Sequence, residues 1–168
     1  MANVKRTSVD ISAVIGGLDK LAAAQESIAR SMGAAMGIEV RDEAKVRVPV
    51  GTDEGGSITP GLLQSAIYVA YDDQRRLLNP GAYRYTVSWN SKKAPHGHLI
   101  EFGHWMPYQY ARTASGDYYT PKPLISLEGN GFWVNARPFL GPAFDAKLPR
   151  LAAVAYEAGR IKFAEVMK

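Results

Sequence analysis

The chain has 168 residues, contains no cysteine and carries a formal net charge of +4. This length suits one domain with a core of its own, and the lack of cysteine excludes disulfides, thiolate metal sites and cysteine nucleophiles. The Lys and Arg residues are scattered, which favours a solvated surface over a nucleic-acid-binding face. No apolar run reaches the length of a membrane span, and the first residues lack the apolar stretch of a secretory signal, so we expect cytoplasmic synthesis and no membrane partner.

The N-terminal part of the chain has a helical pattern. We expect residues 1–20 to form an arm or a short helix, and a longer helix to follow over residues 21–48. An apolar ridge at four-residue spacing marks the longer helix: Ile28, Met32, Met36 and Val40. Gly33 and Gly37 lie beside this ridge and would let another backbone approach closely, either in the protein's own sheet or in a second subunit. Pro49 is expected to end the helix.

Loop and strand signals fill the middle of the chain. Residues 51–61 are rich in Gly, Asp and Thr and predict a surface loop. Residues 66–71 and 83–89 are rich in aromatic and β-branched side chains, and the turn signal at 79–81 between them predicts an antiparallel pair. Residues 131–135 predict a further strand.

A long, aromatic-rich loop insertion is expected over residues 105–130, with room for a hairpin inside it. Loops of this length are often functional or ordered by a partner. Its candidate contact residues are Tyr108, Tyr110, Arg112, Tyr118 and Tyr119. Tyr and Arg can stack on nucleic-acid bases, but they are also favoured at protein interfaces, and we favour the interface.

The C-terminal part has the clearest helical pattern, over residues 149–167, with Pro149 in the first turn and Pro142 in an earlier turn joined at a kink. These elements predict a single α+β domain spanning residues 1–168. In it, an antiparallel sheet of three to four strands is packed by the long N-terminal helix and the C-terminal helix.

Histidine and carboxylate side chains cluster in the segment from residue 96 to 104, which is the best candidate for a reactive site. The candidate metal ligands are His96, His98, Glu101 and His104. Imidazole and carboxylate suit zinc, iron or manganese. Cupin-type barrels use His-x-His followed three or four residues on by Glu, but here the gap between His98 and Glu101 is two and the many short strands of such a barrel are missing. On a strand, however, Glu101 would point away from the histidines, and on a helix His96 and His98 would lie on different faces. A cupin-like metal enzyme or a metal-stabilised domain remains the alternative.

No other chemistry is indicated. The sequence has no Gly-x-Ser-x-Gly nucleophile elbow, and no pair of carboxylates stands out as an acid and base for hydrolysis. We therefore expect no catalysis, no cofactor and no bound metal.

Three segments occur in an order that is more informative than any one of them. The first ends a helix near Pro49 and leads through the glycine loop to residues 61–67, the second is residues 99–104, and the third is residues 136–144. In this order they resemble the tail-completion or neck protein family of long-tailed bacteriophages, whose members include the minor tail protein Z of lambdoid phages. His104 departs from the family pattern, which has Thr there, and the insertion is larger than in a minimal member.

Eight residues carry this resemblance: Pro49, Gly61, Leu62, Glu101, Phe102, Gly103, Pro138 and Phe139. Within the central motif we expect Phe102 to be a core anchor and Gly103 to be a backbone bend. Glu101 is expected to pair with a backbone amide or with an arginine such as Arg137.

The resemblance implies a structural virion protein of the phage neck. Such a protein would assemble with itself as a ring, expected to be a homo-hexamer, between tail terminator or tail tube proteins and the head-side connector proteins. It would complete the tail and permit head–tail joining, and DNA would pass through its channel only as cargo. Assembly would take place in the host cytoplasm.

Overall fold

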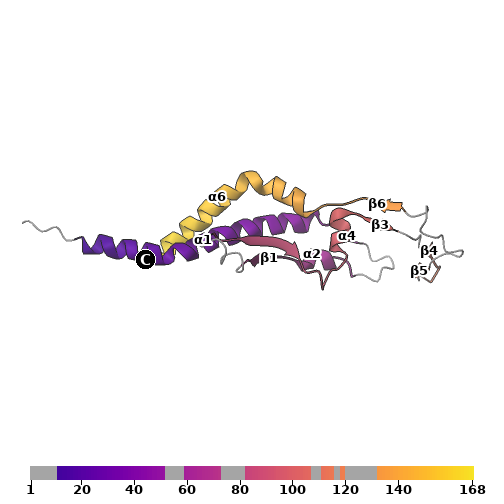
Figure 1. Cartoon of the computed structure of the whole chain (residues 1–168), viewed down its shortest axis with the longest axis horizontal. Helices are drawn as coiled ribbons and strands as arrows, with labels where there is room; N and C mark the ends of the chain where they lie inside the picture. Colours follow the sequence, from indigo (N-terminus) through magenta and orange to yellow (C-terminus); the bar gives the residue numbers. More distant parts are fainter. Residues whose placement is uncertain (1–10, 52–58, 73–81, 107–110, 116–117, 120–131) are drawn as a thin grey trace, which may run out of the picture.

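The computed structural model describes residues 11–51, 59–72, 82–106, 111–115, 118–119 and 132–168. The fold is α+β, as predicted from the sequence. Two long helices lie side by side along an elongated molecule, and short strand pairs lie beside them or beyond their ends (Figure 1). The elements in chain order are α1 (Ser12–Arg47), α2 (Leu62–Ala66), β1 (Ile67–Tyr71), β2 (Tyr85–Trp89), α4 (Gly97–Phe102), β3 (His104–Met106), β4 (Ala111–Arg112), β5 (Tyr118–Tyr119), β6 (Phe132–Val134) and α6 (Leu140–Val166).

Helix α1 is one continuous helix of 36 residues. The expected boundary near residue 20 is wrong, because no proline interrupts this stretch and the residues that follow it are strong helix formers. The helix ends where predicted, since Pro49 holds the preceding Val48 in an extended conformation (φ −63°, ψ 130°). The amide of Gln64 donates to the carbonyl of Lys45 at 2.7 Å and so satisfies one of the last carbonyls of the helix.

Strands β1 and β2 form the predicted antiparallel pair, with Val69 opposite Val87. The pair lies against α1 at the two helix glycines. A Cβ atom on Gly33 would lie 2.6 Å from Cδ2 of Tyr85, and one on Gly37 would lie 2.7 Å from Cγ1 of Val69. These glycines therefore serve the close approach of the protein's own sheet.

The strands of the described residues form three separate antiparallel pairs, β1–β2, β3–β6 and β4–β5. The described residues therefore do not form the predicted single sheet of three to four strands. The strand expected over residues 131–135 does exist, but it pairs with β3, which follows the bend at Gly103, instead of joining β2. The β4–β5 pair is a hairpin-like element inside the expected insertion. Residues 52–58 of the glycine loop and the expected turn at 79–81 lie outside the described residues.

Helix α6 begins nine residues earlier than Pro149, which the structure places inside the helix. The prediction that Pro149 occupies the first turn is therefore wrong. Pro142 takes that role, where the missing N–H leaves no donor unsatisfied. An interior proline removes one helical hydrogen bond and bends the helix, and α6 arches over α1 (Figure 1).

The core lies where the C-terminal end of α1 meets the start of α6. Phe139 is fully buried there, and its ring contacts that of Trp89 edge-on, with 5.9 Å between the ring centroids. The buried cluster consists of Ala44, Val48, Leu63, Ala66, Ile67, Ala94, Phe139 and Ala143. Four of these eight residues are alanines, which let the helices and strands approach each other closely.

Candidate assembly surfaces

The central motif of the sequence positions the start of α6. Oε2 of Glu101 accepts hydrogen bonds from the backbone N–H groups of Phe139 at 2.8 Å and Leu140 at 3.2 Å. The first N–H groups of a helix lack partners within it, and a carboxylate is also favoured by the helix dipole at this end. Glu101 is 8% exposed, and its bond to the N–H of Phe139 is buried, whereas the bond to Leu140 is partly buried. The side chain therefore has a structural role at the junction of α4 and α6.

The structure separates the roles expected for the central motif. Glu101 pairs with backbone amides, and Arg137 instead contributes its own N–H, which donates to the carbonyl of Ile100 at 2.8 Å. Phe102 is 69% exposed, so its expected role as a core anchor is wrong. Adjacent residues of a helix point about 100° apart, and turning Glu101 inward leaves Phe102 outside. Phe139 is the aromatic anchor of the core.

Gly103 provides a backbone bend between α4 and β3. Its φ is +73°, in the left-handed region that favours glycine. A Cβ atom there would lie 2.7 Å from the carbonyl oxygen of Val134 and 2.8 Å from the nitrogen of Ala136. The position needs glycine for both reasons, and the bend brings β3 alongside β6.

The four candidate metal ligands do not converge. Nδ1 of His98 lies 2.6 Å from the carbonyl oxygen of Pro95, and Glu101 is occupied by α6. His96 precedes α4, whereas His104 follows the bend. Within the described ranges, which include all four residues, no three His, Cys, Asp or Glu side chains come close enough to hold a metal ion. The geometry therefore contradicts the metal-site alternative.

The other motif residues and the candidate contact residues are spread over several elements. Gly61 has φ +73° and precedes α2, and Leu62 is the first residue of that helix, but the residue buried in the core is Leu63. Pro138 is exposed next to buried Phe139. Of the candidate contact residues, Tyr108 and Tyr110 lie outside the described residues, whereas Arg112, Tyr118 and Tyr119 belong to strands β4 and β5. Their role in an interface stays a prediction.

The β3–β6 pair, here called the aromatic arm, exposes two tryptophans. Trp105 and Trp133 are directly opposite each other in the register, so they share one face of the ribbon. They are 52% and 54% exposed, and the exposed Phe102 is nearby in the chain. Large exposed aromatic side chains of this kind are typical of protein contact sites. The sequence analysis singled out neither tryptophan as a contact residue, although Trp133 lies in the strand predicted over residues 131–135.

A second uncovered apolar surface, here called the α1 seam, follows the N-terminal half of α1. Its first apolar residues recur at alternating spacings of three and four, and two more continue the stripe beyond Gln25: Ile11, Val14, Leu18, Leu21, and then Ile28 and Met32. Phe163 of α6 lies over the later part, in a hollow of about 550 Å³ that extends back to Leu18. The earlier residues are exposed, and α1 continues beyond the end of α6 (Figure 1).

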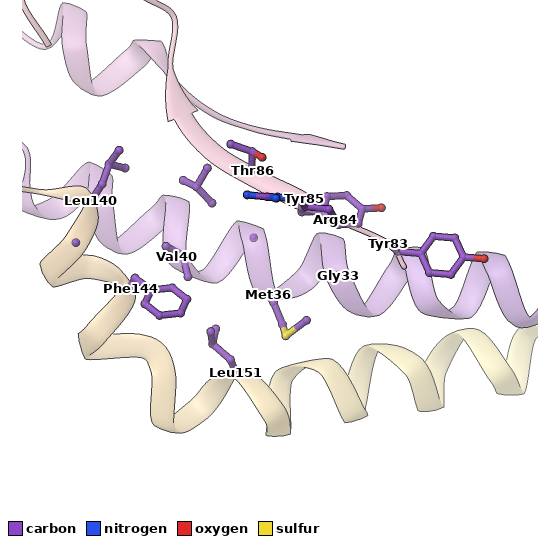
Figure 2. A pocket seen from close by; sticks show the side chains of 13 residues that line it. Gly33, Met36, Val40, Tyr83, Arg84, Tyr85, Thr86, Leu140, Phe144 and Leu151 are labelled. Atoms are coloured by element: carbon purple, nitrogen blue, oxygen red, sulfur yellow. The ribbon is translucent and has the colours of Figure 1, made fainter. Parts of the chain in front are cut away.

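A groove of about 570 Å³ runs between β2 and α6, with α1 as its floor. Figure 2 shows Met36 and Val40 on the floor, Phe144 and Leu151 on the α6 side, and the residues of β2 opposite them. Most of the lining is apolar. Arg84 is the only charged residue among those that line the groove.

The described part of the chain is thus an α+β structure with three uncovered apolar surfaces, and none of its helices is both long and apolar enough to cross a membrane. The sequence model of a phage protein family, described as "Bacteriophage HK97-gp10, putative tail-component", matches residues 12–103. The match covers more than half of the chain, which belongs to this HK97-gp10-like family. The matched segment contains α1, the β1–β2 sheet and Glu101. Neither the comparison with curated proteins nor that with solved structures finds a match.

The family places the chain among the structural components of phage tails. This confirms the predicted class of protein and its virion location at the level of the tail. The matched segment ends at Gly103, so the third motif, over residues 136–144, lies beyond it. The closer resemblance to the minor tail protein Z stays a prediction.

Proposed function

We propose that the protein is a structural component of the phage neck, where it forms a ring at the head–tail junction. In this role it completes the tail, permits the joining of a filled head and surrounds the passing DNA. It would contact itself as a homo-hexamer, tail terminator or tail tube proteins on one side, and head-side connector proteins on the other. Assembly would take place in the host cytoplasm, and the mature location would be the neck of the virion.

The observation that carries this proposal is the distribution of uncovered apolar surface. The α1 seam and the aromatic arm lie toward opposite ends of an elongated molecule (Figure 1). A protein that acts alone rarely exposes several large apolar patches. Burying apolar surface is favourable by about 25 cal/mol per Å², so patches of this kind are usually covered by a partner. Contacts at both ends suit a subunit that has neighbours on more than one side.

The polar groups of the central segment also support a structural role. Glu101 is committed to the start of α6 and the ring of His98 lies beside the carbonyl of Pro95, so both side chains already have structural contacts. The groove beside β2 contains no His, Asp or Glu among its lining residues. This arrangement favours assembly over catalysis.

The test is a phage in which the gene is interrupted by a stop codon. We expect virions of the parent phage to contain the protein at the neck by immunogold microscopy. Without it, filled heads and tails should accumulate separately, and added purified protein should restore joining in the extract. Joined, infectious particles made without the protein, or its absence from purified virions, would contradict the proposal.

A further inference from the structure

We propose that the aromatic arm of one copy docks into the groove beside β2 of a second copy, where one of the two strands of the arm pairs with the outer edge of β2. The inference rests on the proposed self-association and assigns the surfaces that make it. One chain would then carry a groove and an arm that fit each other.

The outer edge of β2 is available for a further strand. The backbone N–H of Asn90 donates to the carbonyl of Ala66 at 3.0 Å, and that of Asp72 donates to the carbonyl of Arg84 at 2.9 Å. These two bonds show which residue pairs of β1 and β2 are hydrogen-bonded to each other. Hydrogen-bonded and non-hydrogen-bonded residue pairs alternate along antiparallel strands. Tyr85 and Val87 belong to non-hydrogen-bonded pairs, so they direct their backbone N–H and C=O groups away from β1. Within the described part of the chain, neither residue has a backbone hydrogen bond on that side.

A sheet of only two strands is marginally stable, and an unpaired edge is a template for a strand from another chain. The groove lies along this edge, with Tyr85 and Val87 lining one side and Phe144 and Leu151 of α6 lining the other (Figure 2). Its volume of about 570 Å³ leaves room for large side chains beside an added strand. The groove therefore fits an extended segment with bulky apolar residues.

The aromatic arm has this chemistry. Its two strands carry no Asp, Glu, Lys or Arg, so no charge would be stripped of water when the arm is buried. Trp105 and Trp133 offer the bulky apolar surface, and Arg84 at the groove can lie over an indole ring. No other strand pair with described side chains exposes two tryptophans.

The occupant must come from a second copy. The arm extends beyond α4, away from the part of α1 and α6 that encloses the groove (Figure 1). A contact between two different surfaces of identical chains is heterologous, and it generates a closed ring when the rotation between neighbours closes. The arm and the groove thus account for a ring without a second kind of subunit.

The first experiment fills the groove without disturbing the fold. Gly141 lines the groove, and a Cβ atom there would meet nothing within 4 Å. We expect Gly141→Leu to fold normally and to weaken self-association, measured by sedimentation of the purified full chain, by at least about tenfold. Gly141→Ala is the matched control, because it removes the same glycine from the helix but leaves the groove open, and it should associate as the parent does.

The arm is tested in the same assay. Trp105→Ser combined with Trp133→Ser should weaken association to a similar degree, whereas Tyr156→Ser, which removes an even more exposed aromatic from α6, should not. Near-native circular dichroism of each variant shows that the fold is retained. Normal association of Gly141→Leu, or of the double Trp variant, would overturn the inference.

The direction of the contact is tested by cross-linking, since the parent chain has no cysteine. Thr86→Cys in β2 and Asn135→Cys beside β6 are made in separate chains, mixed and treated with a short bismaleimide. We expect cross-links in the mixture and few in either variant alone, and none when Asn135→Cys is mixed with Glu157→Cys. Efficient links between two Thr86→Cys chains would show a symmetric contact and overturn the inference.

These results separate the inference from the proposed function. A chain that stays monomeric at high concentration, yet is needed for joining heads to tails, would overturn the arm–groove contact alone. A chain that assembles through the arm and groove but is absent from virions would overturn the proposed function alone.

Discussion

The carboxylate of Glu101 accepts a hydrogen bond from the backbone N–H of Phe139, 38 residues later in the chain, at 2.8 Å. This bond joins two of the segments on which the resemblance to phage neck proteins rests. The first segment, residues 99–104, contains the end of α4 and the bend at Gly103, and the second, residues 136–144, contains the buried anchor Phe139. Two sequence motifs thus form one structural unit, which sets the start of α6 and the root of the aromatic arm.

Replacing Glu101 by alanine tests this unit. The change leaves the buried N–H of Phe139 and the partly buried N–H of Leu140 without their acceptor, and an unsatisfied buried donor costs about 1–3 kcal/mol. We expect Glu101→Ala to lower the free energy of unfolding in urea by about 2–4 kcal/mol. Glu101→Gln keeps one acceptor oxygen and should lose less. Glu157→Ala, on the exposed face of α6, serves as a control, and a loss as small as in that control would contradict the capping role.

Gly103→Ala tests the bend. Alanine is disfavoured at φ +73°, and its methyl group would lie within 2.8 Å of the backbone at both Val134 and Ala136. We expect a loss of stability of about 1–3 kcal/mol, seen as a lower Tm by calorimetry. Gly51→Ala, where a Cβ atom meets nothing within 4 Å, should leave Tm almost unchanged. Equal Tm values for the two variants would show that the bend tolerates a side chain.

The elements that could be predicted are those with a strong local signal. Pro49 fixes the end of α1 through its effect on Val48, and β1 and β2 are rich in the aromatic and β-branched side chains that favour strands. The helix glycines could be recognised as close-contact positions, but the sequence did not say whether the contact was internal. The structure answers this with the contacts of Gly33 to Tyr85 and Gly37 to Val69.

The features that could not be predicted depend on distant contacts. Which strand pairs with β6 depends on the direction that the chain takes after Gly103, and no local pattern encodes this. The inward direction of Glu101 depends on amides that lie 38 and 39 residues away, and Phe102 is exposed as a consequence. Pro149 fits a first turn by local rules, but packing of α6 against α1 maintains the helix through it.

Lys147 links α6 to α1 and predicts a dependence of stability on pH. Its ammonium lies 3.0 Å from Oε1 of Glu39 and 3.4 Å from Oε2 of Glu43. The hydrogen bond to Glu39 is the main cause that raises the pKa of Lys147 above its ordinary value of 10.5. Below that value the amine is charged in both folded and unfolded chains, so the stabilisation is fully present there and is lost as the pH rises through the raised pKa.

The matching measurement compares Tm of the parent with that of Lys147→Met across pH. We expect the parent to be more stable by a constant margin in the neutral range, and the margin to shrink only above pH 10.5. Added salt should reduce the margin, because these side chains are partly exposed. Lys162→Met removes only a pair within α6 and is the control. A margin that closes at neutral pH would contradict the assignment.

The histidines give a direct test of the metal alternative. The combined change His96→Ala and His98→Ala removes the exposed contact of His98 with Pro95, and we expect it to cost no more than about 1 kcal/mol. Elemental analysis of the purified parent should find no stoichiometric zinc, iron or manganese, and a chelator should leave Tm unchanged. Stoichiometric metal that is lost in the double variant would restore the metal-site interpretation.

The α1 seam is expected to bind a neighbour in the tail and to contribute little to the fold. Leu18 and Leu21 are exposed, and α1 extends past the end of α6 in this region (Figure 1). We expect Leu18→Ser with Leu21→Ser to change Tm by only a few degrees, since neither side chain belongs to the buried core, but to reduce incorporation into tails strongly. Asp19→Ser, on the same exposed turn but outside the seam, should be incorporated normally. Normal incorporation of the double variant would show that the seam makes no essential contact, and loss of its fold would show that the seam belongs to the core instead.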